Sequence, residues 1–386
     1  MQFKGFARGS AVGVRNHVAV IPTVGCVNEV ALRIAGNVHG VTPMLHHQGC
    51  AQLGPDLKTV TRVLSGIALN ANVSAVLLVS LGCESVNAED ILEAIKERKP
   101  AALIRVQEVG GITPAVTEGI AVVQRMALAA ATNREDASIE ELVVGVKCGA
   151  SDTTSGLASN VAVGHAVDGI VDLGGTVVFG ETTELMGAEA VIVRRAATPE
   201  IAETILTRVR EMEERARSMG VDMRGSQPSA GNIRGGLSTI EEKSLGAVVK
   251  SGTRPIVGAL EYGEAPTGKG LYFMDSPGRE LEFLTGLAAT GCQVILFSTG
   301  LGAVQGFSLV PVIKVTGNEN TACHLAEHID VDVSGILRGE EELEQAGERL
   351  LREIVRVASG AEVKAEQLAY DVRAVNSSIY VKGPVL

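Results

Sequence analysis

The sequence predicts an α/β protein with a three-layer, Rossmann-like architecture, mostly parallel sheets and two domains. Short apolar segments alternate with polar, glycine-rich turns and with helical segments along the whole chain, which is the pattern of repeated strand–turn–helix units. Aromatic residues make up only 3% of the 386 residues, so the core must consist of aliphatic side chains, as in most parallel sheets. The 45 glycines suit the many tight turns that such units need.

We expect the first α/β domain to span residues 1–225. Its helices are predicted from apolar residues at helical spacing and from residues typical of helix ends. Within Asp56–Leu69, apolar residues recur at helical spacing. Thr198 and Pro199 predict the start of a long charged helix, which Gly220 ends. The strands predicted in this domain are His17–Val24, a short one from Val41, Ala75–Leu81, Ala101–Val106, Leu142–Val146 and Thr176–Phe179, and the remaining helices begin near Asn28, Asn87, Ile112 and Asn160.

Between Gly220 and Gly236 the sequence becomes irregular, polar and rich in glycine. We place the domain boundary there and expect residues 226–386 to form a second Rossmann-like α/β domain. In this half, alternation of strands and helices resumes. The predicted strands are Ile256–Leu260, Gln293–Ser298 and Pro311–Val315, and the predicted helices are Leu281–Thr290 and Glu340–Ala358.

Composition excludes several classes of protein. The net charge of −11 argues against nucleic acid as a partner. No apolar run approaches the roughly 18 residues of a membrane span, and the N-terminus lacks the apolar segment of a signal peptide. We therefore expect a cytoplasmic protein, in which six cysteines are more often free, metal-bound or catalytic than paired. Neither a complete dinucleotide-binding glycine motif nor a Walker A motif occurs, so nucleotide binding is only weakly indicated.

Cysteines follow three of the predicted strands at the point where each strand ends. Cys26, Cys83 and Cys148 occupy these positions. If the strands are parallel neighbours in one sheet, the three sulfurs converge on one edge, where ligands bind in open α/β sheets. Cys50 lies in a similar turn and could be a fourth thiol of a soft metal site. Cys292 and Cys323 lie in apolar or helical segments, and we expect both to be buried and inert.

Further ionisable residues cluster near predicted strand ends. His46 and His47 lie just before Cys50 and could complete a metal site or act as acid and base. Glu181 and Lys147 also follow or end apolar strands closely, as groups that remove a proton or bind a substrate carboxylate would. The residues that we select for acid–base chemistry and substrate binding are Glu84, Ser151, Asp152, Glu184, Lys243 and Lys269.

Several longer motifs occur in a fixed order along nearly the whole chain: Pro22–Asn28, His47–Gly54, Cys148–Asp152, Glu181–Glu189, Gly235–Gly246 and Pro266–Leu271. Together they resemble the altronate/galactarate dehydratase family. This resemblance implies a lyase that removes water from a small-molecule sugar acid and forms a 2-keto-3-deoxy acid. The family also includes sulfolactate sulfo-lyases, which expel sulfite instead of water.

The resemblance also implies a divalent metal, usually iron. We expect Fe2+, with Mn2+ or a [4Fe-4S] cluster as alternatives. The pool of expected ligands is Cys26, His46, His47, Cys50, Cys83 and Cys148.

Single-chain members of that family carry a small β-rich domain before the position equivalent to Lys4, where this chain begins. We therefore expect a large subunit that acts with a separate small β-rich subunit, in an oligomer. Two alternatives stay open, a sulfolactate sulfo-lyase subunit and a thiol-rich metal-binding or redox protein without lyase activity.

Overall fold

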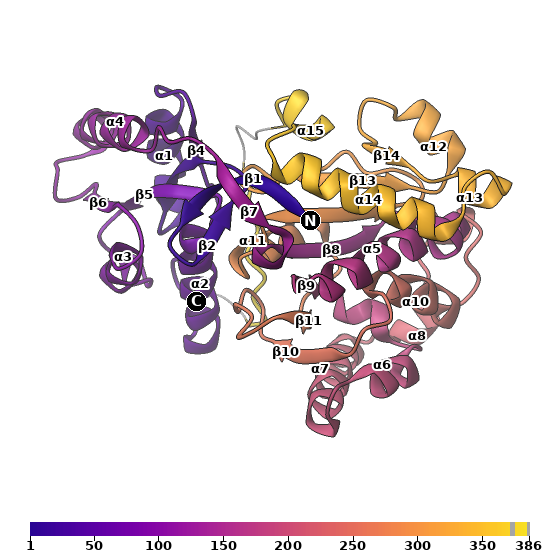
Figure 1. Cartoon of the computed structure of the whole chain (residues 1–386). Coiled ribbons are helices and arrows are strands. Elements are labelled where there is room, and N and C mark those ends of the chain that lie inside the picture. The colour runs from indigo at the N-terminus through magenta and orange to yellow at the C-terminus, as the bar shows by residue number, and fades with distance from the viewer. Residues whose placement is uncertain (371–374, 384–386) are drawn as a thin grey trace.

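The structure is a computed structural model that describes residues 1–370 and 375–383. It is a mixed α/β fold that contains two parallel sheets and one small antiparallel sheet (Figure 1). The α/β class and the mostly parallel sheets predicted from the sequence are confirmed. Within the described ranges, no helix is long and apolar enough to cross a membrane.

The first parallel sheet has four strands in the order β4-β3-β5-β6. Its two faces are covered by different helices, because alternate residues of a strand point to opposite faces. Val18 and Val20 of β3 pack in one core with α1 and α4, whereas Ala19 and Ile21 pack in another core with α2 and α3. These elements are β3 (His17–Pro22), α1 (Asn28–Ala35), β4 (Val41–Pro43), α2 (Gly54–Leu69), β5 (Val73–Ser80), α3 (Ala88–Lys96), β6 (Ala101–Arg105) and α4 (Ile112–Ala129).

The second parallel sheet has seven strands in the order β10-β11-β9-β8-β12-β13-β14. One face packs against α5 and α14 and the other against α11. Helix α11 also packs against α2 of the first sheet, so the two sheets share one continuous core. The elements are β8 (Val143–Gly149), α5 (Asn160–Asp172), β9 (Thr176–Phe179), β10 (Ile256–Leu260), β11 (Gly270–Met274), α11 (Glu280–Ala289), β12 (Val294–Thr299), β13 (Val312–Thr316), β14 (Val331–Asp332) and α14 (Leu343–Ala358).

The antiparallel sheet, in the order β2-β1-β7, pairs two N-terminal strands with a strand that lies between the two parallel sheets along the chain. It consists of β1 (Gln2–Arg8), β2 (Ala11–Gly13) and β7 (Glu135–Ser138). Shorter helices and turns lie beside the two parallel sheets. They are η1 (Gly25–Val27), η2 (Ile139–Glu141), η3 (Ser155–Ser159), η4 (Thr182–Leu185), α6 (Glu189–Arg195), α7 (Pro199–Ser218), α8 (Met223–Ser226), α9 (Ala230–Arg234), α10 (Ile240–Val248), η5 (Val249–Ser251), α12 (Glu319–His324), α13 (Gly335–Arg338) and α15 (Lys364–Gln367).

Two expectations about the arrangement of the chain need correction. The boundary expected near residue 225, between domains 1–225 and 226–386, lies between β9 and β10, and both strands belong to the seven-stranded sheet. That division therefore cuts through one sheet, and the glycine-rich stretch after α7 is a connection within it. The three cysteine-ended strands also do not share a sheet, because β3 and β5 belong to the four-stranded sheet and β8 to the seven-stranded one.

Candidate active site

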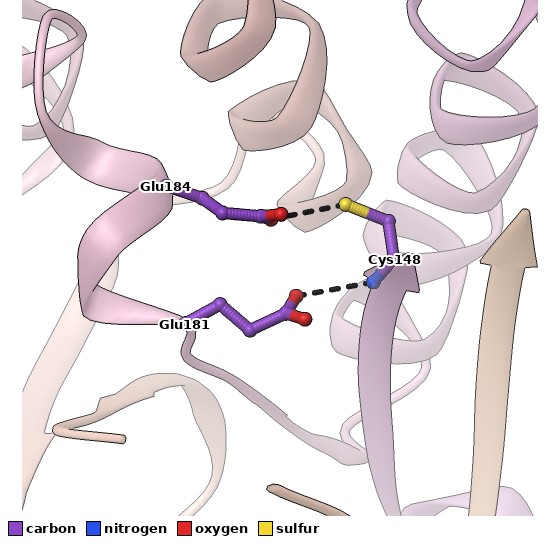
Figure 2. Close-up of side chains that lie close together, drawn as sticks. All are labelled: Cys148, Glu181 and Glu184. Atoms are coloured by element: carbon purple, nitrogen blue, oxygen red, sulfur yellow. Dashed lines mark hydrogen bonds between the residues drawn. The ribbon is translucent and has the colours of Figure 1, made fainter. Parts of the chain in front are cut away.

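A compact group of ionisable side chains lies at the carboxyl edge of the seven-stranded sheet. Cys148 is the second-last residue of β8, Glu181 follows β9, and Glu184 lies on η4 directly afterwards. Figure 2 shows that the three side chains point toward one another. The thiol of Cys148 donates to Glu184 Oε2 (3.1 Å), and its backbone N–H donates to Glu181 Oε2 (3.1 Å).

Two buried lysines complete this group. Lys250, on η5, places its Nζ 3.0 Å from Glu181 Oε2 and 3.1 Å from Glu184 Oε2. Lys147 Nζ lies 3.2 Å from Glu181 Oε1, donates to the Cys148 carbonyl and sits over the ring of Phe297. Two glutamate side chains thus face two lysine side chains, and burial raises the pKa of Glu181 above its usual value. We call Lys147, Cys148, Glu181, Glu184 and Lys250 the buried cluster.

The backbone beside the buried cluster is strained. Glu181 has a φ of 67° and Ala150 a φ of 49°, both in the left-handed region that non-glycine residues rarely adopt. The Glu181 N–H donates to Ser276 Oγ (2.9 Å), a contact that holds this conformation. Such strain costs on the order of 1–3 kcal/mol per residue and occurs preferentially at functional sites.

Burial and the neighbouring charges determine the protonation states. Burial and the Glu184 carboxylate raise the pKa of the Cys148 thiol well above its usual value. Burial alone would raise the pKa of Glu184, but Lys250, Lys243 and the Cys148 thiol lower it to about 2. The pKa of Lys250 is raised well above its usual value because its anionic neighbours outweigh the effect of burial. At neutral pH, Cys148 is therefore a thiol, Glu184 a carboxylate and Lys250 an ammonium group.

The buried cluster opens into a pocket of about 300 Å³ that is lined by Cys148, Ser151, Glu184 and Lys243. Lys243, on α10, is half-buried and also lines two adjoining cavities. These four residues were all selected from the sequence, and the structure places them around one pocket. The pocket is at the lower end of the usual volume range for small-molecule sites. A larger cavity of about 780 Å³ lies beside β4 and α15, and no residue of the buried cluster lines it.

Asp152 also lies at this edge, but its carboxylate already has partners. One oxygen accepts from the Ser155 N–H and the Thr154 hydroxyl, and the other accepts from Asn318 Nδ2. The residue thereby fixes the turn from β8 into η3. This arrangement favours a positioning role for Asp152 over direct contact with a substrate.

The remaining candidates lie elsewhere. At the edge of the four-stranded sheet, Cys26 lies in η1, and Cys50, Cys83 and Glu84 lie on loops. Lys269 precedes β11 and donates to the Glu140 carbonyl, so it lies at the amino edge, opposite the buried cluster.

The two histidines differ from each other. His46 is buried, its Nε2–H donates to the Pro22 carbonyl (2.7 Å) and its Nδ1 accepts from the Gln48 N–H (3.1 Å). Burial lowers the pKa of His46 to about 4. Both of its ring nitrogens are engaged by the backbone, which is the environment of a structural histidine. His47 is exposed and lies 3.0 Å from Gln48 Nε2.

The ligand types of the buried cluster fit a divalent metal ion. Cys148, Glu181 and Glu184 each offer one ligand atom, and the three atoms lie within 4.8 Å of one another. Thiolate and carboxylate ligands suit zinc and ferrous iron. Lys250 contacts both carboxylates, so a cation bound by them would take over the neutralising role of its ammonium group.

A strained, buried group of ionisable residues that opens into a pocket at the carboxyl edge of a parallel sheet is the arrangement of an enzyme active site. Comparison with known proteins identifies the kind of enzyme. Residues 139–380 match the family described as "D-galactarate/Altronate dehydratase, C-terminal", and residues 5–131 match "D-galactarate dehydratase/Altronate hydrolase, second domain". The two matches meet where the four-stranded sheet gives way to the seven-stranded one.

Characterised relatives agree with this assignment. The chain is 39% identical over 374 residues to (2R)-sulfolactate sulfo-lyase subunit beta of Chromohalobacter salexigens, with 95% of each chain covered. It is 34% identical over 392 residues to altronate dehydratase of Bacillus subtilis, covering 97% of this chain and 78% of the relative. It is also 34% identical over 308 residues to galactarate dehydratase (L-threo-forming) of Escherichia coli, covering 78% of this chain and 59% of the relative. The chain therefore belongs to the D-galactarate/altronate dehydratase family, a family of hydro-lyases, as its motifs predicted.

Proposed function

We propose that this chain carries the active site of a lyase that eliminates water from a sugar acid of the altronate type and forms a 2-keto-3-deoxy acid. The observation that carries this proposal is the buried cluster, which opens beside Lys243 into a pocket of about 300 Å³. Family membership supplies the reaction class, and the pocket supplies a place for a small anionic substrate.

The reaction sets clear chemical demands. The bond from C2 of the acid to its hydrogen breaks and its electron pair forms a double bond to C3, while the C3 hydroxyl takes up a proton and leaves as water. The resulting enol becomes the 2-keto acid when C3 gains a proton. Such a site needs a group that fixes the carboxylate, groups that transfer protons, and stabilisation of the negative charge that develops at C2.

Pocket-lining residues can meet these demands. Lys243 is a cation on the pocket wall and would bind the substrate carboxylate. Glu184 is ionised at neutral pH because Lys250 and Lys243 stabilise its charge, so it can accept a proton or a hydrogen bond from the substrate. Lys147 and Lys250 are fully buried behind the carboxylates, and their role is to hold Glu181 and Glu184 in place.

We further propose that a divalent metal, with Fe2+ preferred over Mn2+, binds to Cys148, Glu181 and Glu184. A bound metal would supply Lewis-acid stabilisation of the charge that develops on the substrate. Cys148 would bind as a thiolate and give up its proton, so metal binding should become tighter with rising pH.

Similarity to the sulfo-lyase subunit supports a second candidate reaction. This chain covers 95% of the length of that subunit. In that reaction sulfite leaves from C3 of sulfolactate, and the same proton is removed from C2. Both reactions therefore use the same pocket and cluster and differ in the leaving group.

The same relative is named as a subunit, and we propose that this chain also acts with a separate small subunit. Exposed apolar side chains beside the pocket support this proposal, because a partner would remove them from water. Leu301 lines the pocket itself, Leu157 and Leu245 line an adjoining cavity, and all three are exposed.

The test is an assay of the chain with its co-purified small subunit on altronate, galactarate and sulfolactate. We expect 2-keto acid from altronate without sulfite. Equal amounts of 2-keto acid and sulfite from sulfolactate alone would instead establish the second candidate. No 2-keto acid from any of the three acids would refute the lyase proposal for these substrates and favour a thiol-rich binding protein.

A further inference from the structure

Three exposed cysteines follow neighbouring strands of the four-stranded sheet, which does not contain the buried cluster. Cys26 follows β3, Cys50 follows β4 and Cys83 follows β5. These three parallel strands are direct neighbours in the sheet. Their carboxyl ends therefore meet at one edge, and each thiol sits on the segment that leads from its strand into a helix, with Cys26 within η1.

The three loops are joined to one another by hydrogen bonds next to the cysteines. The Gly25 N–H donates to the Gln48 carbonyl (2.9 Å), which connects the Cys26 loop with the Cys50 loop. The Ser85 N–H donates to the Gly49 carbonyl (2.9 Å), and Ser85 Oγ accepts from the Ala51 N–H (3.1 Å). The Cys83 loop is thus fixed to the Cys50 loop from two sides.

Close backbone packing also holds the Cys50 loop in place. Gly49 has a φ of 108°, and a Cβ at this position would lie 2.2 Å from the Thr23 carbonyl oxygen and 2.7 Å from Val24 Cα. Only glycine fits there. Ala51, which directly follows Cys50, is held at a φ of 56°. The backbone of the Cys50 loop thus adopts strained conformations where it packs against the Cys26 loop.

A limit on how closely the three sulfurs approach one another indicates the kind of group that would bind. Among the described residues, the buried cluster provides the one group of three cysteine, histidine or carboxylate ligand atoms that lie within 4.8 Å of one another. Three thiolates on a single ion, each at about 2.3 Å, would have to lie closer together than that. Thiolates that bind different irons of a cluster can be further apart, because inorganic sulfide bridges the metals.

We propose that Cys26, Cys50 and Cys83 bind a [4Fe-4S] cluster, each thiolate on a different iron, with the fourth iron left for a small ligand. A [2Fe-2S] cluster needs four protein ligands on two irons, so three thiols suit the four-iron cluster better. The N-terminal ends of α1, α2 and α3 follow these loops and favour negative charge at this edge. This site is independent of the proposed metal at Cys148, which lies on the other sheet.

The test is isolation of the full chain without oxygen, followed by reconstitution with iron salts, sulfide and dithiothreitol. We expect about four acid-labile sulfide ions per chain and about four iron ions in addition to any iron at the buried cluster, with absorbance at about 400 nm. The variant with Cys26→Ser, Cys50→Ser and Cys83→Ser should lose the sulfide and this absorbance. Cys323→Ser, which changes another exposed cysteine, and Cys148→Ser should retain both.

Thiol labelling of the unaltered chain gives a second readout that does not depend on folding of the triple variant. With the cluster bound, N-ethylmaleimide should modify Cys323 at least tenfold faster than Cys26, Cys50 or Cys83. Iron without sulfide, equal sulfide in wild type and triple variant, or labelling of all four thiols at the same rate would overturn the proposal. Failure of the lyase assay would leave these readouts unchanged, so the two proposals are tested separately.

Discussion

Replacement of Lys250 by methionine tests the electrostatic design of the buried cluster. Methionine keeps a long unbranched side chain but removes the charge that lies 3.0 Å from Glu181 and 3.1 Å from Glu184. The fall of the Glu184 pKa from 4.5 to about 2 corresponds to about 3 kcal/mol of stabilisation at neutral pH. Removal of one partner of a buried ion pair typically costs about 3–5 kcal/mol. We therefore expect Lys250→Met to lower the free energy of unfolding by about 3–5 kcal/mol at pH 7.

The pH dependence of this loss gives the sharper test. In the wild type, the lowered pKa of Glu184 gives stability that is fully present above about pH 4.5 and is lost toward pH 2. Without Lys250, burial dominates and raises the pKa of Glu184 above its value in the unfolded chain. The folded variant then binds more protons than the unfolded one, so its stability should rise as the pH falls from 7 to 5.

Urea unfolding followed by far-ultraviolet circular dichroism measures both effects, and the chain has no tryptophan for a fluorescence assay. The difference between wild type and Lys250→Met should be smaller at pH 5 than at pH 7. Lys269→Met is the matched control, since this lysine is exposed, and it should change stability by less than about 0.5 kcal/mol. A loss below about 1 kcal/mol in Lys250→Met, or a difference that grows toward pH 5, would refute the assigned charges.

Three further outcomes are expected. Lys243→Met should raise the KM for the acid substrate by about 10- to 100-fold, and an unchanged KM would exclude Lys243 as the carboxylate clamp. Cys148→Ser should lose most of the metal bound at neutral pH, measured by equilibrium dialysis of Fe2+, whereas Cys292→Ser should keep the metal but lose about 1–3 kcal/mol of stability because it buries a hydroxyl. Titration of the chain with its small subunit should increase the rate of 2-keto acid formation until the complex is saturated, and full activity without the subunit would contradict the proposed partnership.

The sequence was most informative where local rules decide the structure. Thr198 and Pro199 begin α7 as predicted, and Thr198 Oγ1 accepts from the Ile201 N–H. The rule that ligands bind at the carboxyl ends of strands led to Cys148 and Glu184, which lie side by side. Local patterns were sufficient here because caps and strand ends depend on residues only a few positions apart.

The pairing of strands that are distant in the sequence could not be predicted from these local patterns. Strand β8 lies between β9 and β12, and β11 pairs with β9 although about ninety residues separate them. Sequence order therefore did not reveal that Cys148 lies on a different sheet from Cys26 and Cys83. Lys250 was missed because it follows the end of α10 rather than a strand. The pairing of Lys250 with two distant glutamates leaves no local signal.

Burial of single side chains was also hard to predict. Cys292 is buried as expected, but Cys323 is exposed, because the short helix α12 lies at the surface. Cys148 was expected in a polar turn at the end of its strand, yet only 1% of its surface is exposed. Its burial follows from neighbouring strands and from Glu184, which are distant in sequence. For this reason the thiol of Cys148 is deeply buried although its local sequence is typical of a turn.

The central claim, that the buried cluster is the catalytic centre of a hydroxy-acid lyase, is tested most directly by Glu184→Gln. This variant keeps the size of the side chain and removes the charge that faces the pocket. Assayed with the small subunit at saturating substrate, it should form 2-keto acid at least about 100-fold more slowly than wild type, while circular dichroism shows the same fold. A folded Glu184→Gln variant with the wild-type rate would contradict the account.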